Sequence, residues 1–223
     1  MRLIVLSAFA AAAALAAPSS DVWTRKDGDS LDGVRWAPLT WDAQAFPNGP
    51  RLTLRGTVQE VYDQLLAVNP DWDTDFALNA TSESPTNEKR DGTFAGAVVI
   101  CNESKYGVPP YKTVVNAMNK FNNRAGPGPI LPPGPNVCSD VYYDSEMTVV
   151  VCNNQSVEKK LESYSEVTSG LQAIRAYCLK LVMMEPYFLG GEAFNSANWS
   201  ITLKRTGYVQ TEGFSRPASQ FGG

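Results

Sequence analysis

The chain has 223 residues, with 19 basic side chains, 23 acidic side chains and no histidine. Without histidine, the Ser-His-Asp and Cys-His forms of nucleophilic catalysis are excluded, and the commonest zinc ligand is missing. The acidic excess falls before residue 91, and the neutral remainder has no basic cluster, which argues against nucleic acid as a ligand.

Residues 1–16 are predicted to be a secretory signal peptide. Arg2 supplies the positive charge at the start, the apolar run over residues 3–15 is too short to cross a membrane, and a small-x-small pattern ends at Ala16. No later segment has an apolar run long enough for a membrane span. The sequence therefore predicts a secreted, extracellular protein.

Residues 17–90 are predicted to be a prosegment with short elements of its own. A strand with alternating apolar residues is expected over 51–55, and Thr57 with Glu60 has the pattern of a helix capping box. The helix that follows has one apolar face and ends at Asn69. An isolated helix of this length is marginally stable in water, so its apolar face needs a partner, and the mature domain is the expected one.

The predicted boundary of the prosegment is a pair of basic residues, Lys89 and Arg90. The pair follows a polar run and precedes the first strong strand, so it lies in a linker where a protease can bind an extended chain. Cleavage by a kexin-type protease would release a mature α/β domain, residues 91–205, with a flexible tail, residues 206–223. Two solvated linker charges are the alternative, although every cysteine lies on the C-terminal side of the pair.

The predicted order of elements in the mature domain is strand, helix, strand, strand, helix, strand. This order favours an α+β fold, a ferredoxin-like βαββαβ sandwich in which a four-stranded antiparallel sheet carries both helices on one face. A second capping box is expected at Ser163 and Glu166, and residues 190–197 are expected to be a Gly-rich polar connection. The elements are expected over 93–101, 111–121, 138–143, 147–152, 163–185 and 198–205.

The four cysteines, Cys101, Cys138, Cys152 and Cys178, predict two disulfides in an exported protein. In a ferredoxin-like sheet the first three lie near one edge, which favours Cys101–Cys138 with Cys152–Cys178. Pairing across the hairpin, Cys138–Cys152 with Cys101–Cys178, is the alternative. No Cys-x-x-Cys spacing is present, so the sequence predicts no metal site and no cofactor.

Four Asn-x-Ser/Thr sequences are predicted N-glycosylation acceptors. They begin at Asn79, Asn102, Asn154 and Asn198. Together they fit a glycoprotein of the secretory pathway.

The candidate recognition residues are Tyr142, Tyr143 and Trp199, because Tyr and Trp dominate binding hot spots. Successive residues of a strand point to opposite faces, so at most one of the two tyrosines is buried on a one-sided sheet, and one is predicted to be largely exposed to solvent. The alternative is that these aromatic residues fill the core or the faces of strands.

Three acidic residues around the hairpin, Asp140, Asp144 and Glu146, raise the hypothesis of a carboxylate-dependent hydrolase. Glycoside cleavage needs two carboxyl groups about 5–10 Å apart in a cleft, one of them with a raised pKa. The alternative is that these acids polarise a turn, where Asp is favoured for local reasons. A protease inhibitor that presents the Pro/Gly-rich loop over 126–135 is a further hypothesis.

Short motifs mark the ends of the predicted strands of the mature domain. They are Cys101 after the first strand, Asn-Val-Cys at 136–138, Cys-Asn-Asn at 152–154, the helix that carries Cys178, and Asn-Trp at 198–199. Together these motifs resemble a group of small secreted fungal proteins with a killer-toxin-like α/β fold. The resemblance implies an effector-like protein that is made as a precursor and cut at a dibasic site, and it implies no catalytic residues.

The sequence therefore predicts a secreted effector-like or killer-toxin-like virulence protein that is not an enzyme. Its predicted partner is a host or competitor protein or a component of the cell surface. The alternatives are a secreted carboxylate-dependent hydrolase and a cell-wall-associated protein without a role in virulence.

Overall fold

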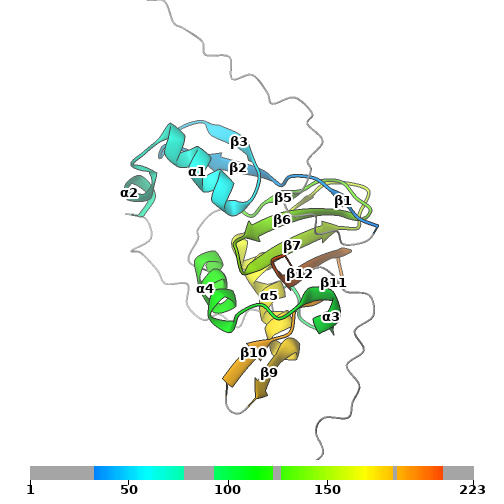
Figure 1. Ribbon diagram of the computed structural model, residues 1–223. Coiled ribbons are helices and arrows are strands. Elements are labelled where there is room, and N and C mark those ends of the chain that lie inside the picture. The colour runs from blue at the N-terminus through cyan, green and yellow to red at the C-terminus, as the bar shows by residue number, and fades with distance from the viewer. Residues whose placement is uncertain (1–32, 78–92, 123–126, 183–184, 208–223) are drawn as a thin grey trace, which may run out of the picture.

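The computed structural model describes residues 33–77, 93–122, 127–182 and 185–207 (Figure 1). We call residues 33–77 the N-terminal segment and the described residues between 93 and 207 the C-terminal segment. None of the helices in these two segments is long and apolar enough to span a membrane. Several predicted sites lie outside the described residues, namely Ala16, Asn79, Lys89, Arg90 and the tail from residue 208 onward.

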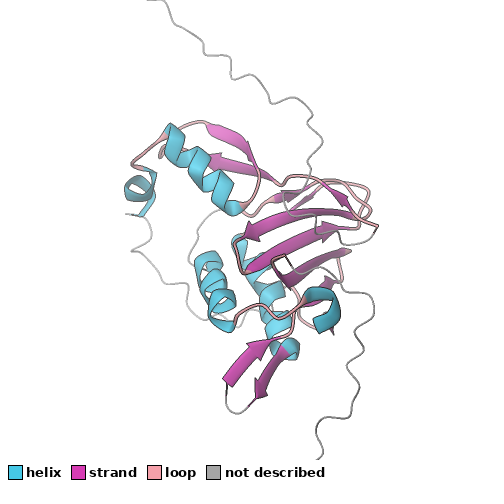
Figure 2. Ribbon diagram, viewed as in Figure 1, coloured by secondary structure: helices cyan, strands magenta, loops and turns pink. Residues whose placement is uncertain are grey.

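A six-stranded mixed sheet forms the centre of the molecule (Figure 1, Figure 2). Its strand order is β1-β6-β7-β12-β11-β4, and only the pairing of β1 with β6 is parallel. The strands are β1 (Arg35–Trp36), β4 (Val98–Cys101), β6 (Val137–Tyr143), β7 (Met147–Asn153), β11 (Gly191–Asn195) and β12 (Trp199–Arg205).

Two smaller antiparallel sheets accompany the large one. The first has the strand order β3-β2-β5-β8, and the second is the two-stranded ribbon β10-β9, which extends from the lower end of the molecule in Figure 1. The strands are β2 (Thr40–Gln44), β3 (Arg51–Arg55), β5 (Ile130–Leu131), β8 (Lys159–Lys160), β9 (Leu179–Val182) and β10 (Glu185–Phe188).

The longest helix, α5, packs against β4, β11 and β12, and α4 lies beside it. The face of α5 that meets the sheet repeats at helical spacing and is fully buried at Val167, Leu171, Ile174 and Cys178. The helices are α1 (Val58–Val68), α2 (Trp72–Ala77), α3 (Glu103–Tyr106), α4 (Tyr111–Asn122) and α5 (Tyr164–Cys178).

The predicted hairpin is confirmed as β6 and β7, with its turn at residues 144–146. The Oδ1 atom of Asp144 accepts hydrogen bonds from the backbone N–H groups of Glu146 and Met147, both at 2.8 Å, and so closes the turn. β7 lies between β6 and β12, and all of its residues are buried. Burial on both faces explains its Val-rich sequence.

The predicted ferredoxin-like sandwich is wrong. Its first strand should be central, but β4 lies at the edge of a six-stranded sheet and pairs only with β11. β11 falls within the predicted connection over 190–197. A Cβ atom on Gly191 would lie 2.8 Å from the Sγ atom of Cys178 and 2.8 Å from the carbonyl oxygen of Ile100. The missing side chain therefore lets β11 lie close to β4 and to the end of α5, and it does not mark a loop.

The helix predicted over 163–185 is too long. α5 ends at Cys178, and the next residue already belongs to β9, which pairs with β10. The carbonyl oxygen of Cys178 accepts a hydrogen bond from the N–H of Leu189 at 3.0 Å, so the chain returns to this point after the ribbon. Leu181, which lies within the predicted helix, is instead part of β9 and is 72% exposed.

Of the two predicted capping boxes, only the first forms. The N–H of Glu60 donates to Thr57 Oγ1 at 3.3 Å, and the N–H of Thr57 donates to Glu60 Oε2 at 2.8 Å. At the start of α5, Ser163 makes no side-chain cap. Its hydroxyl is hydrogen-bonded to that of Ser165 at 2.5 Å, and the carboxylate of Glu166 accepts from the N–H of Glu162.

The two disulfides are Cys138–Cys152 and Cys101–Cys178, so the favoured pairing is wrong and the alternative is correct. Cys138 and Cys152 lie directly opposite each other in the β6–β7 ladder, with their Cα atoms 4.0 Å apart. Cys101 ends β4, which β11 and β12 separate from β7. It therefore lies near the C-terminal end of α5 and not near the hairpin.

Candidate functional site

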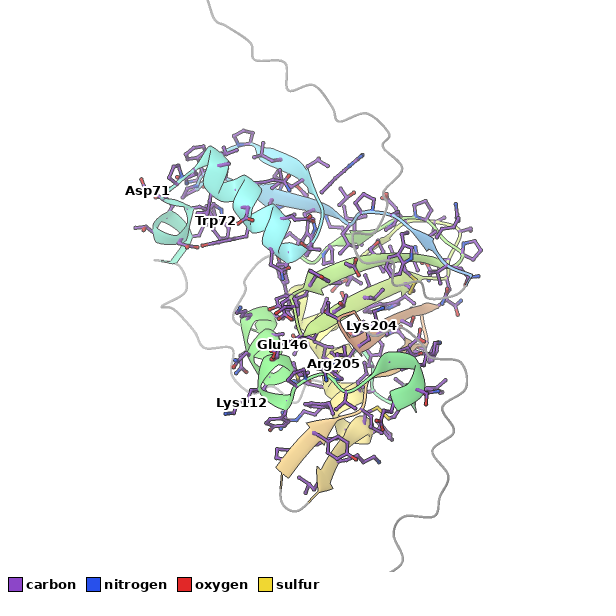
Figure 3. All side chains as sticks on the ribbon, viewed as in Figure 1. Asp71, Trp72, Lys112, Glu146, Lys204 and Arg205 are labelled. Carbon is purple, nitrogen blue, oxygen red and sulfur yellow. A yellow bond between two sulfur atoms is a disulfide. The ribbon has the colours of Figure 1, made fainter. Side chains whose placement is uncertain are left out.

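The acidic residues of the hairpin turn are used in local contacts. Asp144 accepts from the turn backbone and, through Oδ2, from the hydroxyl of Tyr142 at 2.9 Å. Glu146 accepts a hydrogen bond from the hydroxyl of Thr113 on α4 (Figure 3). Asp140 is 8% exposed and lies within β6, opposite Val150. These contacts fit a structural use of the turn acids, which hold the hairpin closed and dock it on α4.

Another carboxylate, that of Glu192 on β11, connects this strand to α3 and β12. Its Oε2 atom accepts from the hydroxyl of Tyr106 at 2.8 Å, and its Oε1 atom accepts from the hydroxyl of Ser200 at 2.8 Å. Burial, followed by the negative charge of Glu192, raises the pKa of Tyr106 above its ordinary value. The nearby Thr202, opposite Glu192 in the ladder, has a buried hydroxyl without a hydrogen-bond partner among the described residues.

This Glu192 cluster is closed rather than open to a substrate. Both carboxylate oxygens are occupied by hydroxyl donors, and Tyr106 is almost fully buried. The cluster ties α3 to β11 and β12. The sequence prediction does not include this cluster, because it treats residues 190–197 as a connection, although Glu192 between apolar neighbours is a signal of a strand.

The three predicted recognition residues do not form one exposed patch. Tyr142 is buried and its ring packs edge-on against Phe121 of α4, whereas Tyr143 is 37% exposed, so the two tyrosines differ in exposure but neither is largely exposed to solvent. Trp199 is 1% exposed and packs edge-on against Phe94 at a ring-centroid distance of 4.8 Å. Trp199 therefore belongs to the core.

Two strongly exposed apolar side chains lie where α5 passes into β9. Tyr177 is 62% exposed and Leu181 is 72% exposed. Beside them is an open groove with a volume of about 370 Å³. The groove is lined by Gln172, Arg175, Ala176, Leu179 and Leu181.

The edge strand β4 has a separate apolar surface on the face that points away from α5. Val98 and Ile100 alternate toward solvent, and the outer edge of β4 has no partner strand among the described residues. The Cys101–Cys178 disulfide fixes the end of β4 to the end of α5, with a Cα–Cα distance of 5.5 Å. We call the two exposed apolar side chains at the junction of α5 and β9 the apolar rim. It consists of Tyr177 and Leu181.

The predicted glycosylation acceptors within the described residues are all exposed. Asn154 directly follows β7, Asn198 lies in the turn before β12, and Asn102 caps α3, where its Oδ1 atom accepts from the N–H of Lys105 at 3.0 Å. Exposure leaves each of them accessible for modification, and occupancy stays a prediction.

We also searched the described residues for a metal site and compared the chain with known proteins. Among the described residues, no group of three or more cysteine or acidic side chains is arranged to hold a metal ion. Comparison with protein-family models, curated proteins and solved structures found no match to this chain.

Proposed function

We propose that this chain is a secreted, disulfide-stapled effector-like or killer-toxin-like protein that acts by binding a host or competitor target. The observation that carries the proposal is the apolar rim, where Tyr177 and Leu181 present large side chains to solvent beside a groove. Tyrosine is enriched among binding hot spots, and apolar side chains that gather on a surface often mark an interaction site.

The chemistry of the chain supports binding over catalysis. Histidine is absent from the sequence, and the carboxylates of Asp144, Glu146 and Glu192 accept hydrogen bonds from neighbouring backbone or hydroxyl groups. Two disulfides are typical of proteins that fold in an oxidising compartment, in agreement with the predicted signal peptide.

The proposal is tested with the fluorescently labelled full chain and two probes, intact yeast cells as a competitor and cultured plant cells as a host. We expect saturable binding to one of the two. Leu181→Ser and Tyr177→Ser should each weaken it about tenfold, which corresponds to the loss of about 1.4 kcal/mol.

The matched control is Val157→Ser, because Val157 is 60% exposed but lies in the connection between β7 and β8. Binding of this variant should equal that of the unchanged chain. The absence of saturable binding to either kind of cell, or equal losses for all three variants, would contradict the proposal.

A further inference from the structure

We infer that the N-terminal segment stays bound to the C-terminal segment after cleavage at Arg90, so that the working protein is a non-covalent pair of chains. The inference rests on the processing that belongs to the proposed function. In that step, water hydrolyses the peptide bond between Arg90 and Asp91 and leaves a carboxylate on the first piece and an amino group on the second. The N-terminal segment is then a permanent subunit and not a discarded leader.

The first tie between the segments is a shared edge of the large sheet. β1 of the N-terminal segment pairs in parallel with β6, which puts Arg35 beside Val137 and Trp36 beside Cys138. The N–H of Ala37 donates to the carbonyl oxygen of Cys138 at 3.0 Å. Loss of β1 would leave the outer edge of β6 unpaired, and unpaired edges promote aggregation.

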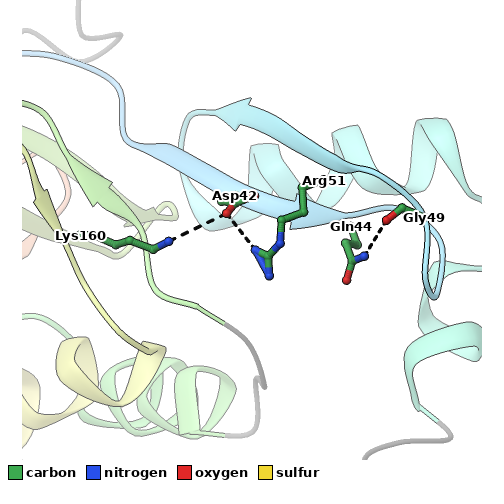
Figure 4. Close-up of polar contacts among 5 residues, drawn as sticks. All are labelled: Asp42, Gln44, Gly49, Arg51 and Lys160. Atoms are coloured by element: carbon green, nitrogen blue, oxygen red, sulfur yellow. Dashed lines mark hydrogen bonds and ion pairs between the residues drawn. The ribbon is translucent and has the colours of Figure 1, made fainter.

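The second tie is the four-stranded sheet β3-β2-β5-β8, which needs strands from both segments. β2 and β3 come from the N-terminal segment, β5 and β8 come from the C-terminal segment, and Thr40 pairs with Ile130 where the two halves meet. Asp42 forms ion pairs with Arg51 at 2.9 Å and with Lys160 of the other segment at 3.9 Å (Figure 4). These side chains are partly exposed, so the ion pairs add little stability and the backbone pairing matters more.

The third tie is a common hydrophobic core. Leu39 and Trp41 are buried in the same hydrophobic cluster as the apolar face of α5. The ring of Trp41 also stacks on that of Tyr164, at a centroid distance of 5.5 Å. α1 buries Val58, Val61 and Leu65 in that cluster. Gln59 on the same helix donates to the carbonyl oxygen of Tyr143 at 2.7 Å.

The N-terminal segment also covers the hairpin disulfide. Val34 and Trp36 pack against a small cluster made by Cys138, Val150 and Cys152 on the large sheet. Both disulfides join cysteines within the C-terminal segment, so no covalent bond would hold the two pieces together after cleavage. Their association depends on the strand pairing and on the shared core.

The test compares the intact and cut full chain by native mass spectrometry and gel filtration. The chain is cut in vitro with purified kexin and, separately, in a variant that carries a viral protease site between residues 84 and 90 with Lys89→Ala and Arg90→Ala. We expect both cut proteins to stay as one complex of two pieces, and to separate in denaturant without a reductant. Separation of the pieces under native conditions overturns the inference.

Variants sharpen the test and separate it from the proposed function. Trp41→Ala should raise the dissociation constant of the cut pair at least about tenfold. Lys160→Ala, which removes only the exposed ion pair, should leave that constant unchanged within about twofold. Resistance of the chain to kexin counts against the proposed processing alone, because the engineered site still measures whether the pieces remain paired.

Discussion

Buried tyrosine hydroxyls connect the elements of this protein at the scale of single residues. Tyr106 reaches from α3 to Glu192, and Tyr142 reaches from β6 to Asp144. Burial, with the hydrogen bond to Asp144, raises the pKa of Tyr142 to about 12, and burial raises that of Tyr106 as well. In both cases the fold favours the neutral phenol over the phenolate.

These raised pKa values predict that the protein loses stability at alkaline pH. An unfolded tyrosine has a pKa of about 10, so the stabilisation is complete below about pH 10 and is lost as the pH rises above that value. We expect the free energy of unfolding, measured with urea, to fall between about pH 10 and about pH 12. Tyr106→Phe should cost about 1–2 kcal/mol near neutral pH and make the alkaline fall less steep.

Tyr177→Phe provides the matched control, because the Tyr177 ring is exposed. It should change neither the free energy of unfolding nor its dependence on pH. An alkaline profile of Tyr106→Phe that parallels that of the unchanged chain would contradict the assignment.

At the scale of elements, the two disulfides staple very different lengths of chain. Cys101–Cys178 joins residues 77 apart and fixes an edge strand to a helix, whereas Cys138–Cys152 joins residues 14 apart that already face each other in a hairpin. A cross-link restricts the unfolded chain more strongly when it closes a longer loop. The long-range disulfide should therefore contribute more stability.

We expect Cys101→Ala with Cys178→Ala to lower the free energy of unfolding by about 4–5 kcal/mol, and Cys138→Ala with Cys152→Ala by about 3 kcal/mol. Urea unfolding of both double variants measures the difference. A larger loss for the hairpin pair would mean that packing around Cys138, and not loop length, dominates. The α5-to-β9 junction should also lose order in the first variant, since the disulfide ends at Cys178.

At the scale of the whole molecule, the N-terminal and C-terminal segments share one hydrophobic core. Trp41 joins them, because its ring stacks on Tyr164 of the C-terminal segment. A hydrogen bond from its Nε1 atom to the carbonyl oxygen of Gly56, at 2.7 Å, fixes the ring within the N-terminal segment. A shared core makes unfolding cooperative, since neither segment can lose its packing without uncovering the other.

The intact chain should therefore unfold in one transition, with coincident curves for circular dichroism and tryptophan fluorescence. Trp41→Ala should lower the free energy of unfolding of that single transition by about 3–5 kcal/mol. Phe46→Ala is the control, because Phe46 is exposed in the same segment, and it should change stability by less than about 0.5 kcal/mol. Two separate transitions would show that the segments fold independently.

Only part of the candidate binding surface can be predicted from the sequence. Strand alternation was enough to predict that Tyr142 and Tyr143 differ in exposure. The exposure of Tyr177 and Leu181 does not follow from the sequence, because the predicted helix continues to residue 185 and includes Leu181. Its true position depends on β10, which pairs with β9 and ends the helix at Cys178.

The amino-acid sequence alone determined the elements whose signals lie within a few residues of one another. The hairpin of β6 and β7, the capped helix α1 and the amphipathic helix α4 follow from side-chain alternation, a capping box and helical spacing. Only the tertiary structure decided the strand order, the cysteine pairing and the two-residue strands β1, β5 and β8. Such short strands have no period of their own, because their hydrogen bonds form only when a distant strand supplies the partner.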